Sequence, residues 1–157
     1  MILQDGPAPN VATVAARPGY RITNLWATDA TPTPVDGSDA VAKVSGVLPP
    51  TNGNVLRIID FPPEPTDLAE RERGFQATFS DLLSDAHQHE HKPHPGMHLT
   101  QTVDYALVLE GEIVAILDAE ETLMSAGDVL IQRGTNHAWA NRSGSNARIA
   151  FILIDGC

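Results

Sequence analysis

The sequence predicts an all-β protein of the barrel or sandwich class, organised as one domain of 157 residues. From residue 97 onward, short segments rich in Val and Ile alternate apolar and polar positions, which is the period expected of half-buried strands. Turns that contain Gly, Asn or Asp separate these segments at close spacing, as in small barrels and sandwiches. A hydrophobic fraction of 42% supplies enough apolar side chains for one packed core.

The expected elements fall into three regions. Residues 1–61 form an N-terminal arm followed by strands, residues 66–85 a helical insertion, and residues 96–156 the barrel core. The N-terminal strands are expected at 11–16, 20–26, 41–48 and 55–61, with Arg17-Pro18-Gly19 between the first two. The core strands are expected at 97–109, 112–118, 121–125, 128–132, 136–142 and 147–154.

Residues 66–85 are predicted to be helical because Phe75, Phe79, Leu82 and Leu83 fall on one helical face. Gly74 is a position at which the segment could divide into two short helices. The helix either packs on the outside of the barrel or covers its mouth as a flap. The second arrangement gains support from the position of the segment, which leads directly into a cluster of histidines.

Composition excludes several classes of partner. The formal net charge is −10 and the isoelectric point about 4.8, so electrostatics disfavours nucleic acid and anionic membranes as partners. The lone cysteine, Cys157, cannot form an internal disulfide, so the fold does not depend on an oxidising compartment. The first residues lack the pattern of a signal peptide, and no apolar run approaches the ~20 residues of a membrane span. We therefore expect a soluble cytoplasmic protein.

Four polar side chains, those of His98, Thr100, Thr102 and Asp104, share one strand face because they occur at every second position. Such a face could simply meet water. However, the same parity continues into the apolar pair at 106 and 108. A face that is polar at one end and apolar at the other suits the inside of a barrel with a site at its mouth.

His137 follows a Gly-Thr-Asn turn and shares a strand face with Trp139. Taken alone, His137 fits a hydrogen-bonded structural histidine, and Trp139 fits either a pocket wall or core packing. Together with His98 and Asp104, His137 completes a set of two histidines and one carboxylate. This set suits Zn, Fe(II), Mn or Ni and leaves coordination positions for water or substrate.

The region from 96 to 156 resembles the small single-domain cupins, the RmlC-like jelly-roll family. The first cupin motif is matched by His98-x-Thr100-x3-Asp104-x6-Gly111, and the second by Gly127-x4-Gln132-x-Gly134-x2-His137-x3-Asn141. About 15 residues separate the two motifs, as in compact cupins. The wider match is to a subgroup that carries Met-His-x-Thr-x-Thr-Val-Asp-Tyr and Gln-Arg-Gly-Thr-Asn-His-Ala-Trp, and residues 21–31 resemble its N-terminal region. The resemblance implies a double-stranded β-helix, or jelly-roll barrel, with an N-terminal strand extension and a short helical insertion.

The motifs also depart from the family pattern. The family's second histidine is Thr100 here, the glutamate is the shorter Asp104, the motif-two proline is Gln132 and the leading glycine is Lys92. The family's metal ligands therefore carry over to His98, Asp104 and His137 only. Three residues could hold a divalent ion, a fourth could be recruited, or the site could hold none.

A dense cluster at residues 87–98 offers the nearest additional ligand. His87, His89 and His91 fit a solvated loop, whereas His94 is stiffened by prolines on both sides and precedes His98 by four residues. We expect His94 to line the pocket, where it would act as an acid or base or as a ligand. Arg133 and Arg148 are candidates for contacting an anionic substrate, although surface positions suit them better.

We therefore expect a metal-dependent cupin enzyme that acts on a small organic molecule, such as a secondary metabolite, with lyase or isomerase chemistry: decarboxylation, dehydration or cyclisation. In this reading His98, Asp104 and His137 hold a divalent ion, His94 moves a proton, and Thr100, Thr102 and Trp139 contact the substrate. The alternatives are an Fe(II)-dependent dioxygenase and a non-catalytic binding module. Since cupins commonly pair through N-terminal strands, we also expect a homodimer with residues 11–26 in its interface.

Overall fold

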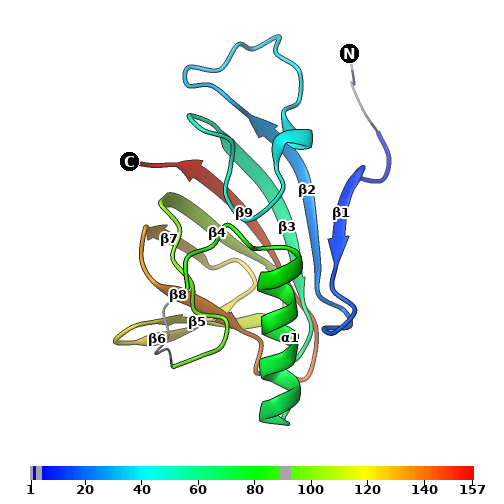
Figure 1. Ribbon diagram of the computed structural model, residues 1–157, viewed down its shortest axis with the longest axis vertical. Coiled ribbons are helices and arrows are strands. Elements are labelled where there is room, and N and C mark those ends of the chain that lie inside the picture. The colour runs from blue at the N-terminus through cyan, green and yellow to red at the C-terminus, as the bar shows by residue number, and fades with distance from the viewer. Residues whose placement is uncertain (1, 3–4, 89–92) are drawn as a thin grey trace.

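The computed structural model describes residue 2 and residues 5–88 and 93–157, and their strands form two facing sheets (Figure 1). The strands are β1 (Asn10–Thr13), β2 (Arg21–Thr28), β3 (Asn54–Phe61), β4 (Thr102–Glu110), β5 (Glu112–Leu117), β6 (Glu121–Ser125), β7 (Val129–Arg133), β8 (His137–Ala140) and β9 (Ala147–Asp155). One α-helix, α1 (Leu68–Asp81), and a short 3₁₀ helix, η1 (Val41–Lys43), complete the described elements. The predicted all-β fold with one helical insertion is confirmed.

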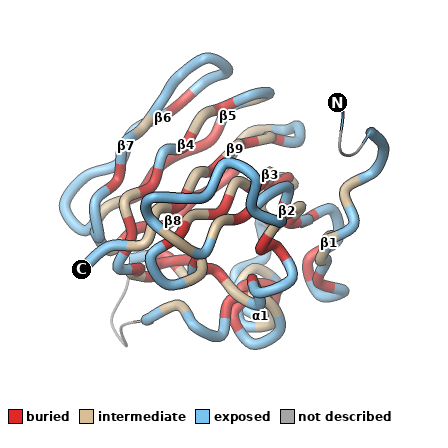
Figure 2. The backbone as a smooth tube through the Cα atoms, turned by 90° about the horizontal axis from the view of Figure 1, so that it is seen from above, coloured by how far each residue is buried: buried red, intermediate tan, exposed pale blue. Residues whose placement is uncertain are grey.

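The larger sheet has the strand order β1-β2-β3-β9-β4-β7, so the N-terminal strands extend the sheet that carries the first motif. All of its pairings are antiparallel. The smaller sheet has the order β6-β5-β8 and carries His137 on β8. Alternate residues of β3, β4 and β9 are buried and belong to the core, and Figure 2 colours the buried residues red along these strands.

Asp67 caps the N-terminus of helix α1, and its carboxylate accepts a hydrogen bond from the Glu70 N–H at 2.7 Å. The helix is continuous through Gly74, where a Cβ atom would lie 3.3 Å from the Ala16 carbonyl oxygen. Phe75 and Phe79 are buried against the barrel, and with Thr78 they line the cavity between the sheets. The helix therefore covers the cavity, and the flap arrangement is the one that the structure favours.

Two expected strands differ most from the structure, while the strands expected at 11–16 and 136–142 are shorter, at Asn10–Thr13 and His137–Ala140. Residues 41–48 are not a strand but η1 followed by irregular backbone, because Val41, Val44 and Val47 turn into the core from a loop. The strand expected from residue 97 begins only at Thr102. Residues 98 and 99 instead make isolated bridges, to His137 and His87 respectively.

The outer face of the larger sheet is apolar over its central strands. The following residues lie at outward positions: Trp26, Leu56, Ile58, Val103, Tyr105, Leu107, Val129, Ile131, Ile152 and Ile154. They alternate with the buried positions of the same strands, and Val129 and Ile131 are more than half exposed. Among the described residues, no helix is long and apolar enough to cross a membrane.

Candidate functional site

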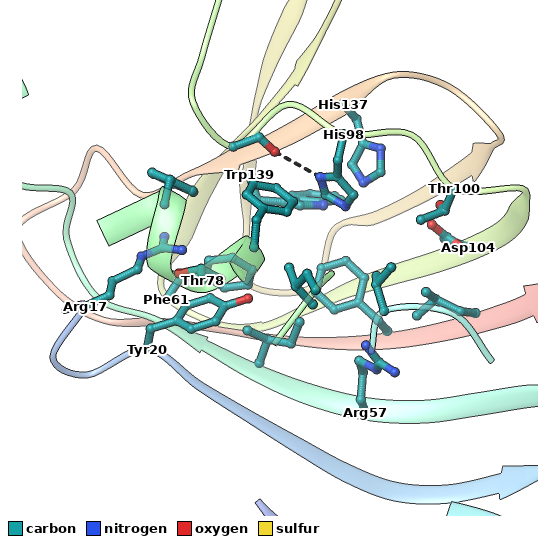
Figure 3. Close-up of a pocket in the computed structure, with 18 residues that line it drawn as sticks. Arg17, Tyr20, Arg57, Phe61, Thr78, His98, Thr100, Asp104, His137 and Trp139 are labelled. Carbon is teal, nitrogen blue, oxygen red and sulfur yellow. Dashed lines mark hydrogen bonds between the residues drawn. The ribbon is translucent and has the colours of Figure 1, made fainter. Parts of the chain in front are cut away.

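An apolar cavity lies between the two sheets, under helix α1 (Figure 3). Its walls come from β3, β4, β8, β9, α1 and the turn before β2. The lining residues are Arg17, Tyr20, Val47, Arg57, Ile59, Phe61, Phe75, Thr78, Phe79, Leu83, Gly96, His98, Thr100, Asp104, His137, Trp139, Phe151 and Leu153. The structure thus brings His98, Thr100, Asp104, His137 and Trp139 to one cavity, as the sequence predicts.

His98 and His137 lie side by side because their backbones pair. The His98 N–H donates to the His137 carbonyl and the His137 N–H to the His98 carbonyl, each at 2.9 Å. Their ring centroids are 4.3 Å apart. Nδ1 of His98 lies 2.9 Å from the Gly96 carbonyl oxygen, which orients that ring. The bridge between residues 98 and 137 is therefore what joins the two sequence motifs into one site.

The His137 ring is held by residues of its own turn. Its Nδ1 lies 3.0 Å from the Thr135 carbonyl oxygen and in contact with the Gln132 side-chain amide. Burial first, and the adjacent His98 second, lower the pKa of His137 to about 3, while the Thr135 contact acts in the opposite direction. His137 is therefore a neutral imidazole across the physiological pH range.

Asp104 is buried beside two threonines. The hydroxyls of Thr100 and Thr102 are hydrogen-bonded at 2.8 Å, and Oδ1 of Asp104 has no hydrogen-bond partner among the described residues. Burial raises the pKa of Asp104, although a hydrogen bond from Thr102 and the charge of Arg57 act in the opposite direction. Thr100 reaches the cavity, whereas Thr102 is not part of the lining and supports Thr100 from behind.

The donor types of His98, Asp104 and His137 suit a divalent ion, but their placement does not make a three-residue centre. Within residues 5–88 and 93–157, no group of three or more His, Cys, Asp or Glu side chains is positioned to hold a metal ion together. His89 and His91 lie outside the described residues, so the structure gives no position for them as additional ligands. We therefore derive no chemical step from a metal, and metal binding stays a prediction.

The structure places His94 outside the cavity lining. Its Nε2 lies 2.9 Å from a carboxylate oxygen of Glu64, and its Nδ1 accepts a hydrogen bond from the Gly96 N–H at 3.0 Å. Since both ring nitrogens contact protein groups, this placement does not support an acid or base role. His94 instead fixes the backbone at Gly96, whose carbonyl orients His98.

Two arginines, Arg17 and Arg57, line the cavity, and sequence reasoning did not identify them. Arg57 lies on β3 at the same parity as the buried Val55 and Ile59, and this charged residue on an apolar face was the available signal. Arg17 gave no comparable signal, since it belongs to a turn. Arg133 and Arg148, which were considered for an anionic substrate, are absent from the lining of this cavity.

Comparisons with known proteins agree with this architecture. Residues 84–154 match the family model of the cupin domain, Cupin_2. A solved structure described as a Cupin 2 conserved barrel domain protein, from Salinispora arenicola CNS-205, covers 99% of this chain and 91% of its own, with a TM-score of 0.51 and 12% identity. At that identity the likeness concerns the fold alone.

Two relatives come from fungi. The phomopsin biosynthesis cluster protein C' of Diaporthe leptostromiformis is 46% identical over 61 residues, which are 38% of this chain and 32% of that protein. The cupin-domain-containing oxidoreductase srdD of Neurospora crassa is 28% identical over 138 residues, which are 83% of this chain and 56% of that protein. The chain thus spans only about a third to just over half the length of these relatives. Residues 84–154 thus match the cupin domain, the fold is similar to that of a cupin barrel, and the relatives of this chain include proteins of fungal secondary-metabolite biosynthesis clusters.

Proposed function

We propose that the protein is a small-molecule enzyme of the lyase or isomerase type, which binds an apolar organic substrate in its cavity and moves a proton on it. The observation that carries this proposal is the meeting of two imidazoles and one carboxyl on the wall of an otherwise apolar cavity. Titratable groups that converge inside an apolar pocket are a recurrent feature of catalytic sites. The relatives from secondary-metabolite clusters support a small organic substrate.

In the proposed reaction, the His98 imidazole removes a proton from a carbon next to a substrate carbonyl, and the neutral His137 ring packs against it at a centroid distance of 4.3 Å. The carbonyl oxygen accepts a hydrogen bond from the Thr100 hydroxyl or from a protonated Asp104, which stabilises the enolate that forms. In an isomerisation the imidazolium returns the proton to a different atom. In a dehydration the hydroxyl group leaves with a proton from Asp104.

Helix α1 supports this chemistry by covering the cavity. Phe79 contacts the His98 ring at a centroid distance of 5.5 Å. Phe75, which also lines the cavity, stacks against the guanidinium of Arg17. Apolar cover of this kind keeps water from the imidazoles, and electrostatic interactions are stronger where water is excluded. A substrate of largely apolar character fits these walls.

A generic test is deuterium incorporation into phenylacetone and phenylpyruvate, which carry acidic C–H groups beside a carbonyl. The wild-type protein in D₂O is expected to exchange at least one of them faster than buffer does, as measured by ¹H NMR. His137→Ala and Asp104→Asn should lower the enzymatic rate roughly 10²-fold or more. Exchange at the buffer rate, both in metal-free protein and after loading with Zn, Fe(II), Mn or Ni, would contradict the proposal.

An oxidoreductase is the second candidate, because the relative from Neurospora crassa is described as one. Two histidines and a carboxylate also belong to the ligand sets of non-haem iron oxygenases. Elemental analysis of protein purified without a His tag, together with oxygen consumption in the presence of substrate, separates the candidates. Less than about half an equivalent of metal, unchanged in His98→Ala and His137→Ala, would rule out the metalloenzyme forms. Ligand binding without turnover would indicate the third alternative, a binding module.

We also infer that two copies of this chain pair through the apolar outer face of the larger sheet. Five strands about 4.8 Å apart, each presenting about 20 Å of length, give a flat footprint of about 500 Å². Soluble monomers rarely expose apolar patches larger than a few hundred Å². A second copy of the chain fits this face. Two chains of net charge −10 repel each other, but the central outward positions carry no charged residue, so the two copies can approach there. Trp26 belongs both to this face and to the predicted interface region, residues 11–26.

A further inference from the structure

Arg57 is a buried cation whose hydrogen-bonding groups are largely unused. The residue is 1% exposed, and its Nη2 donates to the Gly46 carbonyl at 3.3 Å. Its Nε and Nη1 have no hydrogen-bond partner among the residues that the structure describes. Arginine is almost never fully buried unless it is paired, because an unpaired buried charge is costly. Burial lowers the pKa of Arg57 only to about 10, so the group stays charged at neutral pH.

The two carboxyl groups whose charges act on Arg57, those of Asp85 and Asp104, do not pair with it. The Asp85 carboxylate accepts hydrogen bonds from the backbone N–H groups of Val47 and Leu48, at 2.8 and 3.0 Å. Asp104 acts on Arg57 only through its charge, and its own Oδ1 is also without a partner among the described residues. The cavity therefore contains an unused donor and an unused acceptor on its polar side.

Arg17 adds a second cation to the same cavity. Its guanidinium lies between two aromatic rings, 4.2 Å from the centroid of Tyr20 and 4.1 Å from that of Phe75. Its Nη2 is likewise without a partner in the described part of the chain. Two arginines thus face one aspartate in the lining, whereas the whole chain carries a net charge of −10. The local charge of the cavity is the opposite of that of the molecule.

We propose that the cavity takes an organic anion, a small and largely apolar molecule bearing a carboxylate, and that Arg57 binds this carboxylate through Nε and Nη1. Arginine is well suited to recognising carboxylates, and charge-assisted hydrogen bonds are strong where water is excluded. The rest of the ligand lies against the apolar walls of Phe61, Trp139 and Phe151. This assignment deepens the proposed function, on which it rests for the identity of the site.

The position of Arg57 gives the carboxylate an orienting role. In Figure 3, Arg57 lies on the opposite side of the cavity from His98 and His137. A ligand held by its carboxylate at Arg57 therefore extends toward the two imidazoles. Arg57 would thus select which end of the substrate reaches the acid–base groups.

Calorimetric titration with 3-phenylpropanoate and its uncharged amide, 3-phenylpropanamide, tests the assignment. The wild-type protein is expected to bind the carboxylate roughly tenfold or more tightly than the amide at neutral pH. Arg57→Met should abolish this preference, and Arg57→Lys should retain part of it. Arg133→Met, which removes an exposed arginine on β7, should leave the preference unchanged and serves as the matched control.

Urea unfolding distinguishes a ligand-binding arginine from a structural one. If Arg57 binds ligand and does not stabilise the fold, Arg57→Met should be at least as stable as the wild type. Methionine then replaces an unpaired buried charge with an apolar chain of similar length. Destabilisation of Arg57→Met together with an unchanged preference for the carboxylate would overturn the proposal. Equal binding of acid and amide by the wild type would also overturn it, as would failure to bind 3-phenylpropanoate, benzoate and hexanoate.

The two proposals fail in different experiments. Carboxylate-selective binding that depends on Arg57, without deuterium exchange into any probe, would remove the enzymatic function and leave the anion site standing. Deuterium exchange that depends on His137 but is unchanged in Arg57→Met, with no preference for carboxylates, would remove the anion site and leave the enzymatic function standing.

Discussion

Gly96 is the residue at which His94, His98 and helix α1 meet. Its N–H donates to Nδ1 of His94, and its carbonyl oxygen lies 2.9 Å from Nδ1 of His98. A Cβ atom at this position would lie 2.7 Å from Cε1 of Phe75 and 3.1 Å from Nδ1 of His94. The position therefore requires glycine because of close neighbours.

We expect Gly96→Ala to destabilise the protein by about 1–3 kcal/mol, since the added methyl overpacks a closed site. Urea unfolding measures this loss. The same variant should weaken ligand binding, because displacement of Phe75 or of the His98 ring changes the cavity wall. Gly144→Ala is the control, since a Cβ there has open space around it. Equal stability of the two variants would contradict the crowding described.

Asp60 makes stability depend on pH at the edge of the apolar outer face. Its carboxylate accepts hydrogen bonds from Arg21 Nη2 at 2.7 Å and from Arg148 Nε at 2.8 Å. Burial raises the pKa of Asp60, but the hydrogen bonds and charges of Arg148 and Arg21 outweigh burial, so the net shift is downward. A lowered pKa in the folded state means that the ionised carboxylate stabilises the fold above its unfolded-state pKa. That contribution is lost as the pH falls through the folded-state pKa.

Asp60→Asn is therefore expected to be less stable than the wild type at pH 7, by about 1 kcal/mol, since both arginines are partly exposed to solvent. The difference should shrink as the pH falls below about 4, the ordinary pKa of an aspartate. Unfolding free energies from urea titrations between pH 3 and 7 provide the measurement. A difference that does not change with pH would mean that the loss comes from packing and not from charge.

At the scale of the elements, α1 is the part whose role the sequence left open. Its apolar spacing predicts the helix, and its contact with the cavity follows from Phe75, Thr78 and Phe79 in the lining. Phe79→Ala should destabilise the protein by about 3–5 kcal/mol and weaken binding of 3-phenylpropanoate, because a cavity wall and the ring beside His98 are lost. Leu68→Ala, at an exposed position of the same helix, is the control. Similar effects of the two substitutions would contradict the covering role of α1.

The strands show what periodicity can and cannot predict. The alternation from Thr102 to Val108 correctly places Thr102, Asp104, Ala106 and Val108 on one buried face. Residues 41–48 also bury valines, but they do so from a loop, and periodicity alone does not distinguish that case. His98 is the other limit: it reaches its partner through an isolated bridge. The cupin resemblance, not strand periodicity, brought His98 and His137 together in one expected site, and the bridge itself was not predicted.

The sequence predicted the polar residues of the candidate site but not the buried arginine that gives it positive charge. Strand parity and the cupin resemblance place His98, Asp104 and His137 in one cavity, as observed. They do not give Arg57, since an arginine within an apolar strand more commonly extends its charged end to solvent. His94 was expected in the pocket from its closeness in sequence to His98. Its contact with the carboxylate of Glu64, thirty residues away along the chain, is a tertiary contact that no local pattern predicts.

At the scale of the whole molecule, the apolar outer face is expected to hold a second copy of the chain. Ile131→Lys, on the exposed face of β7, should convert a dimer into a monomer, because each copy would bury a lysine without an ionic partner. Sedimentation velocity gives the oligomeric state directly. Leu123→Lys, on the exposed face of β6 in the smaller sheet, should leave the dimer intact. A wild-type protein that is monomeric at high micromolar concentration would contradict the proposed pairing.

The central claim is that the cavity between the sheets binds and orients a small organic anion beside the two imidazoles. A crystal structure of the wild-type protein with 3-phenylpropanoate tests it most directly. The account predicts the carboxylate within hydrogen-bond distance of Nε or Nη1 of Arg57, and the ring among the aromatic walls with its far end toward His98 and His137. A ligand bound elsewhere, or a cavity closed by a direct ion pair between Arg57 and Asp104, would contradict it.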